Sequence, residues 1–165
     1  MSIVLEQGFQ KLEQRPISKG PPLERYTSEI WQFIDAQLPG YGPDWYRDLT
    51  QRYRIGGAFF RYPLDTERPH LGSCWIARPS SALLYVYEVW PLPQLYAQGF
   101  CCFADGEDGN VWMFQNQAAD DPLVYFLEAT AWDGLAPSKS NGLHEPKITL
   151  SEFLRYGTTW APSVE

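Results

Sequence analysis

The chain has 165 residues, of which 44% are hydrophobic and 16% aromatic, and its formal net charge is −7. This length fits one domain of ordinary size, and so large an apolar and aromatic content excludes a disordered chain. The negative charge, without any cluster of Lys and Arg, argues against binding to nucleic acid or to an anionic membrane surface and favours a basic partner.

The start of the chain and its cysteines carry no targeting or disulfide pattern. The first six residues lack the basic start and apolar run of a signal peptide, and no stretch of about 18 apolar residues follows. We therefore expect a cytoplasmic protein without a membrane segment. The three cysteines, Cys74, Cys101 and Cys102, are odd in number and lack CxxC spacing, so neither a disulfide framework nor a zinc site is predicted.

Residues 1–25 are predicted to be an N-terminal extension. The apolar positions between Ser2 and Gln14 are compatible with a short amphipathic helix, which the Pro and Gly residues from Pro16 to Pro22 then break. Because breakers at this density separate segments, we expect the extension to be loosely attached. The single domain is then expected to span residues 26–165.

Two helices are predicted at the start of this domain. Thr27 or Ser28 can cap the first, whose apolar positions recur at intervals of four residues up to Leu38. The second is expected from Pro43 to about Tyr53, because proline is favoured at a helix start. The apolar face expected for the second helix is formed by Trp45, Leu49 and Tyr53.

From Ala58 onward, short runs rich in Val, Tyr, Phe and Trp alternate with Pro, Gly or Asp, which predicts β-strands. The predicted strands are residues 59–62, 83–90, 99–103, 111–114 and 123–128. A helical turn is expected at Pro91–Tyr96 and a surface loop at Trp132–Pro146. Helices first and strands after them predict an α+β domain with a mostly antiparallel sheet of about five to six strands.

A C-terminal helix is predicted to pack against this sheet. Thr149–Glu152 has the sequence of a capping box, and apolar residues follow it at Phe153, Leu154 and Tyr156. Gly157 is expected to end the helix, because glycine is common just after a helix C-terminus.

The segment Phe103–Phe114 is predicted to be a β-hairpin with an acidic loop. Glycine and Asn or Asp in the loop supply the positive φ that a tight reversal needs. Such a loop could hold a cation, carry a catalytic carboxylate, or turn the chain while presenting negative charge to a partner. A calcium site is disfavoured by the spacing of the ligands. A calcium loop that began at Asp105 would need a glutamate at its twelfth position, and this position is Asn116.

Other chemical motifs are weak in this chain. His70 and His144 lie in Pro-containing loops, and Cys74 could form a nucleophile–base pair with either, but no known motif surrounds them. Asp120 and Asp121 precede a proline and are typical of a turn. We expect neither a metal nor a cofactor.

Eight segments follow one another in a characteristic order: Ile30–Phe33, Leu38–Pro39, Gly56–Gly57, Leu84–Val89, Pro91–Leu95, Phe103–Phe114, Leu123–Phe126 and Ile148–Leu154. This succession resembles the SUKH superfamily, the Smi/Knr-type immunity and cell-wall-regulator domain. The resemblance covers about residues 26–157 and implies a non-enzymatic binding domain, in bacteria most often an immunity protein that neutralises a cognate secreted toxin, frequently a nuclease.

We therefore expect a monomeric or weakly dimeric immunity protein that binds a toxin directly. The residues expected to contact this partner are Asp105, Glu107, Asp108, Asp120 and Asp121. Two alternatives of other classes stay open, a general protein-interaction or regulatory domain of the same fold and a sugar-binding module. A third is a small hydrolase that would use Glu88, Asp105 or Glu128.

Overall fold

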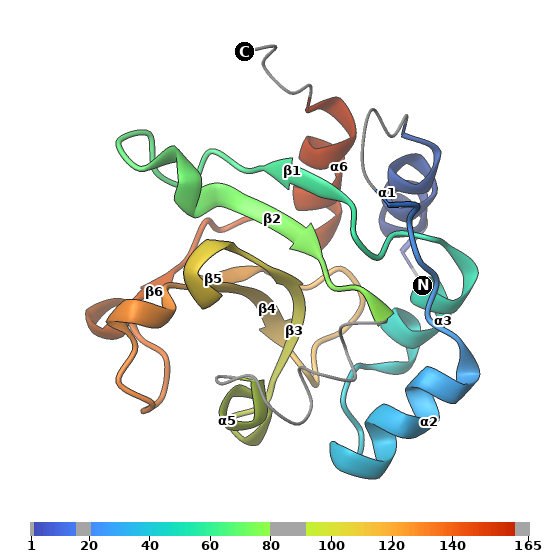
Figure 1. Cartoon of the computed structure of the whole chain (residues 1–165), viewed down its shortest axis with the longest axis horizontal. Coiled ribbons are helices and arrows are strands. Elements are labelled where there is room, and N and C mark those ends of the chain that lie inside the picture. The colour runs from blue at the N-terminus through green and yellow to red at the C-terminus, as the bar shows by residue number, and fades with distance from the viewer. Residues whose placement is uncertain (1, 16–20, 80–91, 161–165) are drawn as a thin grey trace.

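The computed structural model describes residues 2–15, 21–79 and 92–160. Within these ranges it contains five α-helices, six β-strands and four 3-10 helices (Figure 1). The α-helices are α1 (Ile3–Gln14), α2 (Ser28–Gln37), α3 (Asp44–Arg52), α5 (Leu92–Ala97) and α6 (Leu150–Thr159). The strands are β1 (Phe59–Arg61), β2 (Ser73–Ile76), β3 (Phe100–Asp105), β4 (Val111–Gln115), β5 (Tyr125–Leu127) and β6 (Leu143–His144). The 3-10 helices are η1 (Pro69–Gly72), η2 (Glu107–Gly109), η3 (Ala129–Ala131) and η4 (Lys139–Asn141).

The six strands form one antiparallel sheet in the order β1-β2-β3-β4-β5-β6, so each strand pairs with the next along the chain. The predicted α+β class is confirmed. Strands β2 and β6 were not predicted, and β6 falls inside the expected loop Trp132–Pro146. The predicted strand at residues 83–90 lies outside the described residues.

The strand register places apolar side chains on both faces of the sheet. One face carries a row that crosses all six strands: Phe59, Trp75, Asp105, Val111, Leu127 and Leu143. A row on the other face comprises Ile76, Ala104, Trp112, Phe126 and His144. Directly opposed residues share a face, because side chains alternate along each strand.

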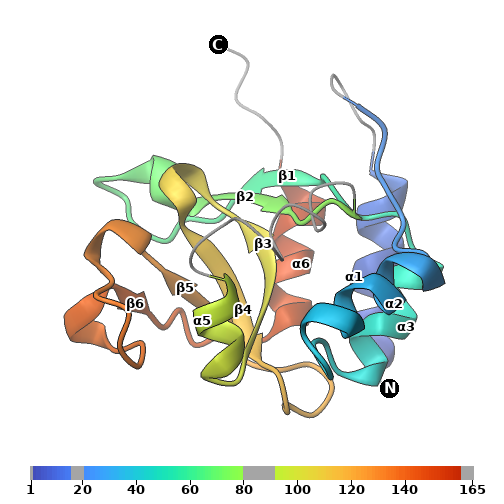
Figure 2. The same cartoon turned by 60° about the horizontal axis from the view of Figure 1, so that its bottom comes forward.

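The larger part of the core lies on the face that carries Trp112 and Phe126. Helices α1, α2, α3 and α6 contribute buried side chains to that cluster, whereas α5 and Trp132 cover Val111 and Leu127 on the other face. Figure 2 shows α5 in front of the sheet and α6 behind it. The sheet is therefore a central layer with unequal cores on its two faces.

Helix α1 belongs to the larger core, so the expectation of a loosely attached N-terminal extension is wrong for this part. Leu5, Phe9 and Leu12 are almost completely buried. Gly8 lies against α6, where an added Cβ would come within 3.3 Å of the Leu154 Cβ. The apolar residues at intervals of three and four form one face, and that face packs on α6 rather than remaining in solvent.

The next two helices begin where the sequence predicts. The Thr27 hydroxyl accepts a hydrogen bond from the backbone N–H of Ile30 and caps α2, and Pro43 directly precedes α3. The buried face of α3 differs in part from the prediction. Tyr46 and Leu49 are buried, whereas Trp45 is half-buried.

Helix α6 confirms the capping box and corrects the predicted helix end. The Thr149 hydroxyl accepts from the Glu152 N–H, and the Glu152 carboxylate accepts from the Thr149 N–H. The helix continues through Gly157 to Thr159. An added Cβ at Gly157 would come within 2.7 Å of the Phe60 ring, so this glycine allows close packing on β1 rather than ending the helix.

Candidate protein-binding surface

The predicted hairpin between β3 and β4 is confirmed. In its loop, Asp108 and Gly109 have positive φ values of 56° and 77°, and the Gly106 N–H donates to the Asn110 carbonyl at 2.7 Å. The Asn110 side-chain oxygen accepts from the Ala129 N–H at 2.8 Å. These bonds hold the acidic loop against η3, so its carboxylates extend from a well-braced turn.

Three of the predicted partner-binding residues lie together on this hairpin. Asp105 ends β3 directly opposite Trp75 of β2. Glu107 accepts a hydrogen bond from the Ser73 hydroxyl at 3.2 Å, and Asp108 is exposed. The hairpin carboxylates therefore adjoin β2, which the sequence analysis did not predict.

Further carboxylates reach the same end of the sheet through Arg68. Its guanidinium contacts Asp65 at 3.0 Å and Glu128 at 3.0 Å, and Glu128 in turn contacts the His144 ring nitrogen Nε2 at 3.3 Å. The hydrogen bond from Arg68 holds the pKa of Asp65 below its usual value. We call the following carboxylates, which span both faces of the sheet at this end, the acidic rim: Asp65, Asp105, Glu107, Asp108 and Glu128.

The other two predicted partner-binding residues lie elsewhere. Asp120 and Asp121 follow β4, whereas the hairpin precedes it, so the length of β4 separates the two groups. The Asp121 carboxylate accepts hydrogen bonds from the N–H and the hydroxyl of Ser151, each at 2.7 Å. Asp121 thus anchors the first turn of α6, and this contact gives it a structural role.

The carboxylates of the hydrolase alternative are not brought together. Asp105 shares a face of the sheet with Leu127, and the extended Glu128 follows Leu127 and points toward the opposite face, where it meets His144. Glu88 lies outside the described residues. Asp105 and Glu128 therefore do not form the facing pair that acid–base catalysis on one bond requires.

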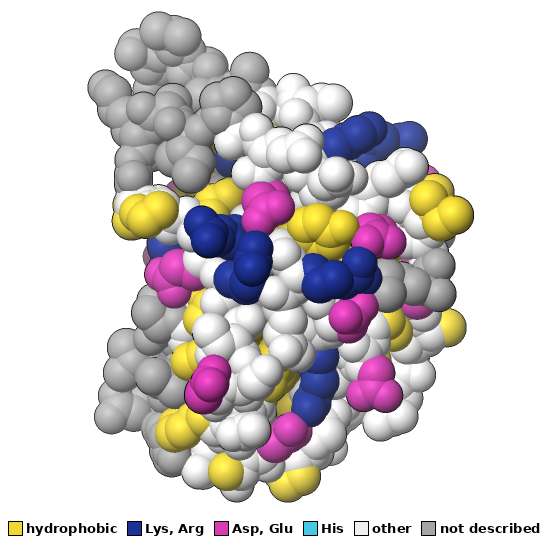
Figure 3. Space-filling view, turned by 90° about the vertical axis from the view of Figure 1, so that its right-hand side faces the viewer, with side chains coloured by type: hydrophobic (Ala, Val, Ile, Leu, Met, Phe, Trp, Pro, Cys, Tyr) yellow, Lys and Arg dark blue, Asp and Glu magenta, His cyan; other side chains and the backbone are white. Residues whose placement is uncertain are grey.

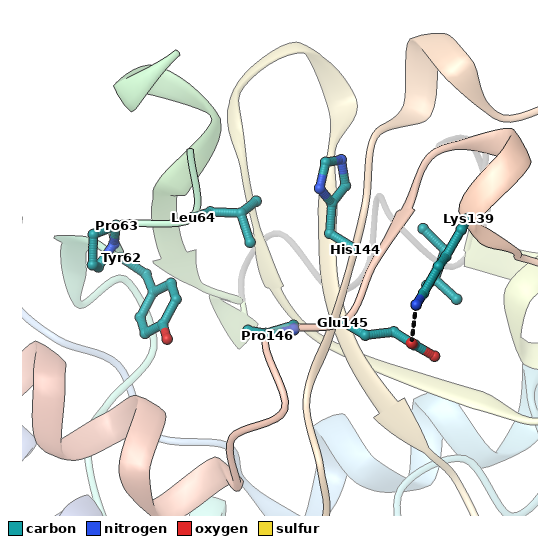
Figure 4. Close-up of a pocket in the computed structure, with 8 residues that line it drawn as sticks. Tyr62, Pro63, Leu64, Lys139, His144, Glu145 and Pro146 are labelled. Atoms are coloured by element: carbon teal, nitrogen blue, oxygen red, sulfur yellow. Dashed lines mark ion pairs between the residues drawn. The ribbon is translucent and has the colours of Figure 1, made fainter. Parts of the chain in front are cut away.

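A groove opens where the chain leaves β1 and passes β6 (Figure 4). Its volume is about 550 Å³, and Tyr62, Leu64 and His144 line it together with an ion pair of 3.5 Å between Lys139 and Glu145. Glu128 orients the His144 ring. Within the described ranges, no hydroxyl or thiol is hydrogen-bonded to His144, so the groove holds an oriented imidazole without an adjacent nucleophile.

The cysteines are placed for packing rather than for nucleophilic attack. Cys74 and Cys101 are fully buried, and burial raises the pKa of the Cys101 thiol to about 12. Burial also raises the pKa of Cys74 well above its ordinary value. Because the thiolate is the reactive form, this burial disfavours Cys74 as the nucleophile of a pair with a histidine.

The helical side of the molecule carries charges of both signs. Figure 3 shows Lys and Arg side chains interspersed with Asp and Glu there. Arg52 contacts Glu6 at 2.5 Å and Asp48 at 2.7 Å, and Arg25 contacts Glu13 at 3.7 Å. Paired charges of this kind leave little net field.

An aromatic cluster lies beside the hairpin. It consists of Phe59, Trp75 and Trp160. The Phe59 and Trp75 rings lie 4.6 Å apart between centroids, and the Trp160 ring meets Phe59 at 5.5 Å in an edge-to-face arrangement. Trp75 keeps 37% of its surface exposed, which is unusual for a tryptophan in the middle of a strand pair.

Comparison with known proteins leaves the family open. The chain matches no protein-family model, no curated protein and no solved structure. The SUKH assignment therefore stays a prediction. Among the described helices, none has the length and apolar character needed to cross a bilayer, and the described residues contain no group of three or more potential metal ligands.

Trp75 is the main residue of this surface that the sequence analysis missed. The segment Ser73–Ile76 is only four residues long and directly follows the 3-10 helix η1, so it lacks the length of a convincing strand. Its neighbours Cys74 and Ile76 are buried while Trp75 points outward. This alternation of burial indicates a strand with one face open, and it is visible only in the structure because all three residues are apolar.

Proposed function

We propose that this protein is a non-enzymatic binding domain, an immunity protein of SUKH type that neutralises a cognate secreted toxin by direct contact. The observation that carries the proposal is the acidic rim. Asp105 lies opposite the exposed Trp75, and Glu107 bonds to Ser73 of the same strand. At the same end of the sheet, Arg68 joins Asp65 and Glu128. A surface on which carboxylates outnumber cations, next to an aromatic anchor, is the composition expected for binding a basic protein.

The rim and the anchor have separate physical roles. Exposed carboxylates raise the rate of encounter with a basic partner, and this contribution falls as salt increases. An aromatic side chain such as Trp75 contributes mainly to the lifetime of the complex, because its burial removes a large apolar area from water. Together they allow binding that is both fast and long-lived.

Co-expression with the toxin encoded beside this gene tests the proposal. We expect protection of the cells and co-purification of the two proteins. Surface plasmon resonance should then show that Glu107→Gln with Asp108→Asn slows association roughly 3- to 10-fold at low salt and flattens the salt dependence. Asp120→Asn, at the other end of β4, is the matched control and should leave association unchanged.

Three results would contradict the proposal in whole or in part. Full protection without any detectable complex would exclude neutralisation by binding. Association that is unaffected by the double variant would exclude the hairpin from the interface. A stable complex with a protein that is not toxic, without any protection, would favour the alternative of a general interaction or regulatory domain.

A hydrolase is the second candidate, and the pairing of His144 with Glu128 beside the groove favours it. A carboxylate that orients an imidazole is a common arrangement for a general base. Turnover of ester, glycoside and phosphodiester substrates that falls by orders of magnitude in His144→Asn would support this candidate. A binding domain would instead show no turnover to lose.

A further inference from the structure

Strand β1 lies at one edge of the sheet (Figure 1), and among the described strands it pairs with β2 alone. The Tyr62 N–H donates to the Gly72 carbonyl at 2.8 Å, which shows that the even-numbered residues here direct their backbone groups toward β2. Phe59 and Arg61 therefore direct their N–H and carbonyl groups away from the sheet. An edge of this kind can pair with a strand of another chain.

The outward groups of β1 have the spacing needed to pair with a second copy of the same strand. In an antiparallel pair centred on Phe60, Phe59 of each copy would lie opposite Arg61 of the other. Both of these symmetric pairs would then exchange two N–H···O=C bonds. In the part of the chain that the structure describes, nothing bonds to the Phe59 N–H or to the N–H and carbonyl of Arg61, so these groups are free for such pairing.

Arg15, which directly follows α1, occupies the remaining outward group. Its guanidinium donates to the Phe59 carbonyl at 2.5 Å and to the Gly157 carbonyl in the last turn of α6 at 2.8 Å. The guanidinium carbon also lies 5.9 Å from the Trp160 ring centroid, and the residue is half-buried. The acceptor that Arg61 of a second copy would need is therefore already bonded.

We propose that the outer edge of β1 is a pairing surface for a second copy of this chain, and that Arg15 blocks it. In a symmetric dimer, each copy would lose the bond between its Phe59 carbonyl and the Arg61 N–H of the other copy. Arg15 also places a positive charge where the Arg61 side chain of the second copy would approach, and charge at an edge opposes pairing. This inference goes beyond the proposed function and does not depend on the toxin.

Sedimentation velocity of the full chain over a wide range of concentrations tests the inference. Arg15→Met keeps an apolar stem but removes the charge and the donors. We expect this variant to form dimers roughly 10- to 100-fold more tightly than the unchanged chain, because one acceptor in each copy becomes free. Arg54→Met removes an exposed arginine whose side chain bonds to no described residue, so this matched control should leave association unchanged.

Substitutions of Arg61 locate the contact. Arg61→Pro removes the outward N–H, and proline is tolerated in an edge strand where that group faces away from the sheet. Arg15→Met combined with Arg61→Pro should therefore return to the behaviour of the unchanged chain. Arg61→Ala keeps the N–H, and in the Arg15→Met background it should leave the dimer intact. Hydrogen exchange of the Phe59 and Arg61 amides should slow in the Arg15→Met dimer, since both become bonded.

A folded Arg15→Met variant that associates no more than the unchanged chain would overturn the inference. A dimer or a larger aggregate that Arg61→Pro does not reverse would also overturn it, because the interface would then lie elsewhere. Loss of the native circular dichroism spectrum in Arg15→Met would have the same consequence, since Arg15 would then be required for the fold. Dimerisation of the unchanged chain that Arg61→Pro abolishes would show that Arg15 does not block the edge.

Discussion

Replacement of Phe153 by alanine is the sharpest test of how α6 completes the fold. The Phe153 side chain is fully buried on α6. Its ring centroid lies 4.6 Å from that of Trp112 and 5.0 Å from that of Phe60. Tyr62 and Phe103 rings approach it at 5.7 Å and 5.6 Å. The ring is therefore the meeting point of the helix with strands β1, β3 and β4.

The expected cost follows from this environment. A buried Phe→Ala change costs about 3–5 kcal/mol, and the loss of several aromatic contacts places Phe153→Ala toward the upper end. Thr149→Ala removes only the cap of α6 and should cost about 1 kcal/mol. For a chain of this size, these changes correspond to melting temperatures lower by roughly 8–20 °C and by 2–4 °C.

Urea denaturation followed by circular dichroism measures both changes as shifts of the midpoint at constant slope. Phe153→Leu is the conservative control and should lose clearly less free energy of unfolding than Phe153→Ala. Equal and negligible effects of Phe153→Ala and Thr149→Ala would refute the reasoning, because the C-terminal segment would then not be a packed helix.

Two further predictions concern the first helix and one ion pair. Deletion of residues 1–15 should lower the melting temperature strongly or prevent folding, because Leu5, Phe9 and Leu12 leave the core; a melt identical to that of the full chain would contradict this. Arg47 donates two hydrogen bonds to the Asp35 carboxylate and lowers its pKa in the folded protein. The charged carboxylate therefore stabilises the fold at pH values above the unfolded pKa of about 3.9. This stabilisation is lost as the pH falls through the lower pKa of the folded protein. Asp35→Asn should therefore cost less than about 1 kcal/mol at neutral pH, the carboxylate being 40% exposed, and a smaller amount near pH 2. A cost that is the same at both pH values, measured by urea denaturation, would exclude this linkage.

Local signals in the sequence determined many of the element boundaries. The caps at Thr27 and Thr149 bond to backbone N–H groups within the next three residues, so their effect depends only on neighbouring sequence. The hairpin follows in the same way from glycine and aspartate at positions that need positive φ. The order of helices and strands was sufficient for the α+β class.

Local signals were insufficient where long-range packing decides. The apolar face of α1 is visible in the sequence, but whether it stays in solvent or packs on α6 depends on Gly8 meeting Leu154, far away in the chain. Glycine is typical of a helix end, but Gly157 lies against the Phe60 ring inside the helix. The space beside this ring admits only a residue without a side chain. In both cases a partner distant in sequence overrides the local preference.

The binding surface was decided by the tertiary structure for the same reason. Composition alone indicated an acidic protein with a basic partner. The sequence analysis assigned five acidic residues to one binding surface because of their charge, without knowing where they lie in the fold. Strand order separates Asp121 from the hairpin and assigns it to α6. The bulge in β3 and the pairing of β2 bring Asp105 beside Trp75. Register is set by contacts across the whole sheet, and a shift of one residue would turn these side chains to opposite faces.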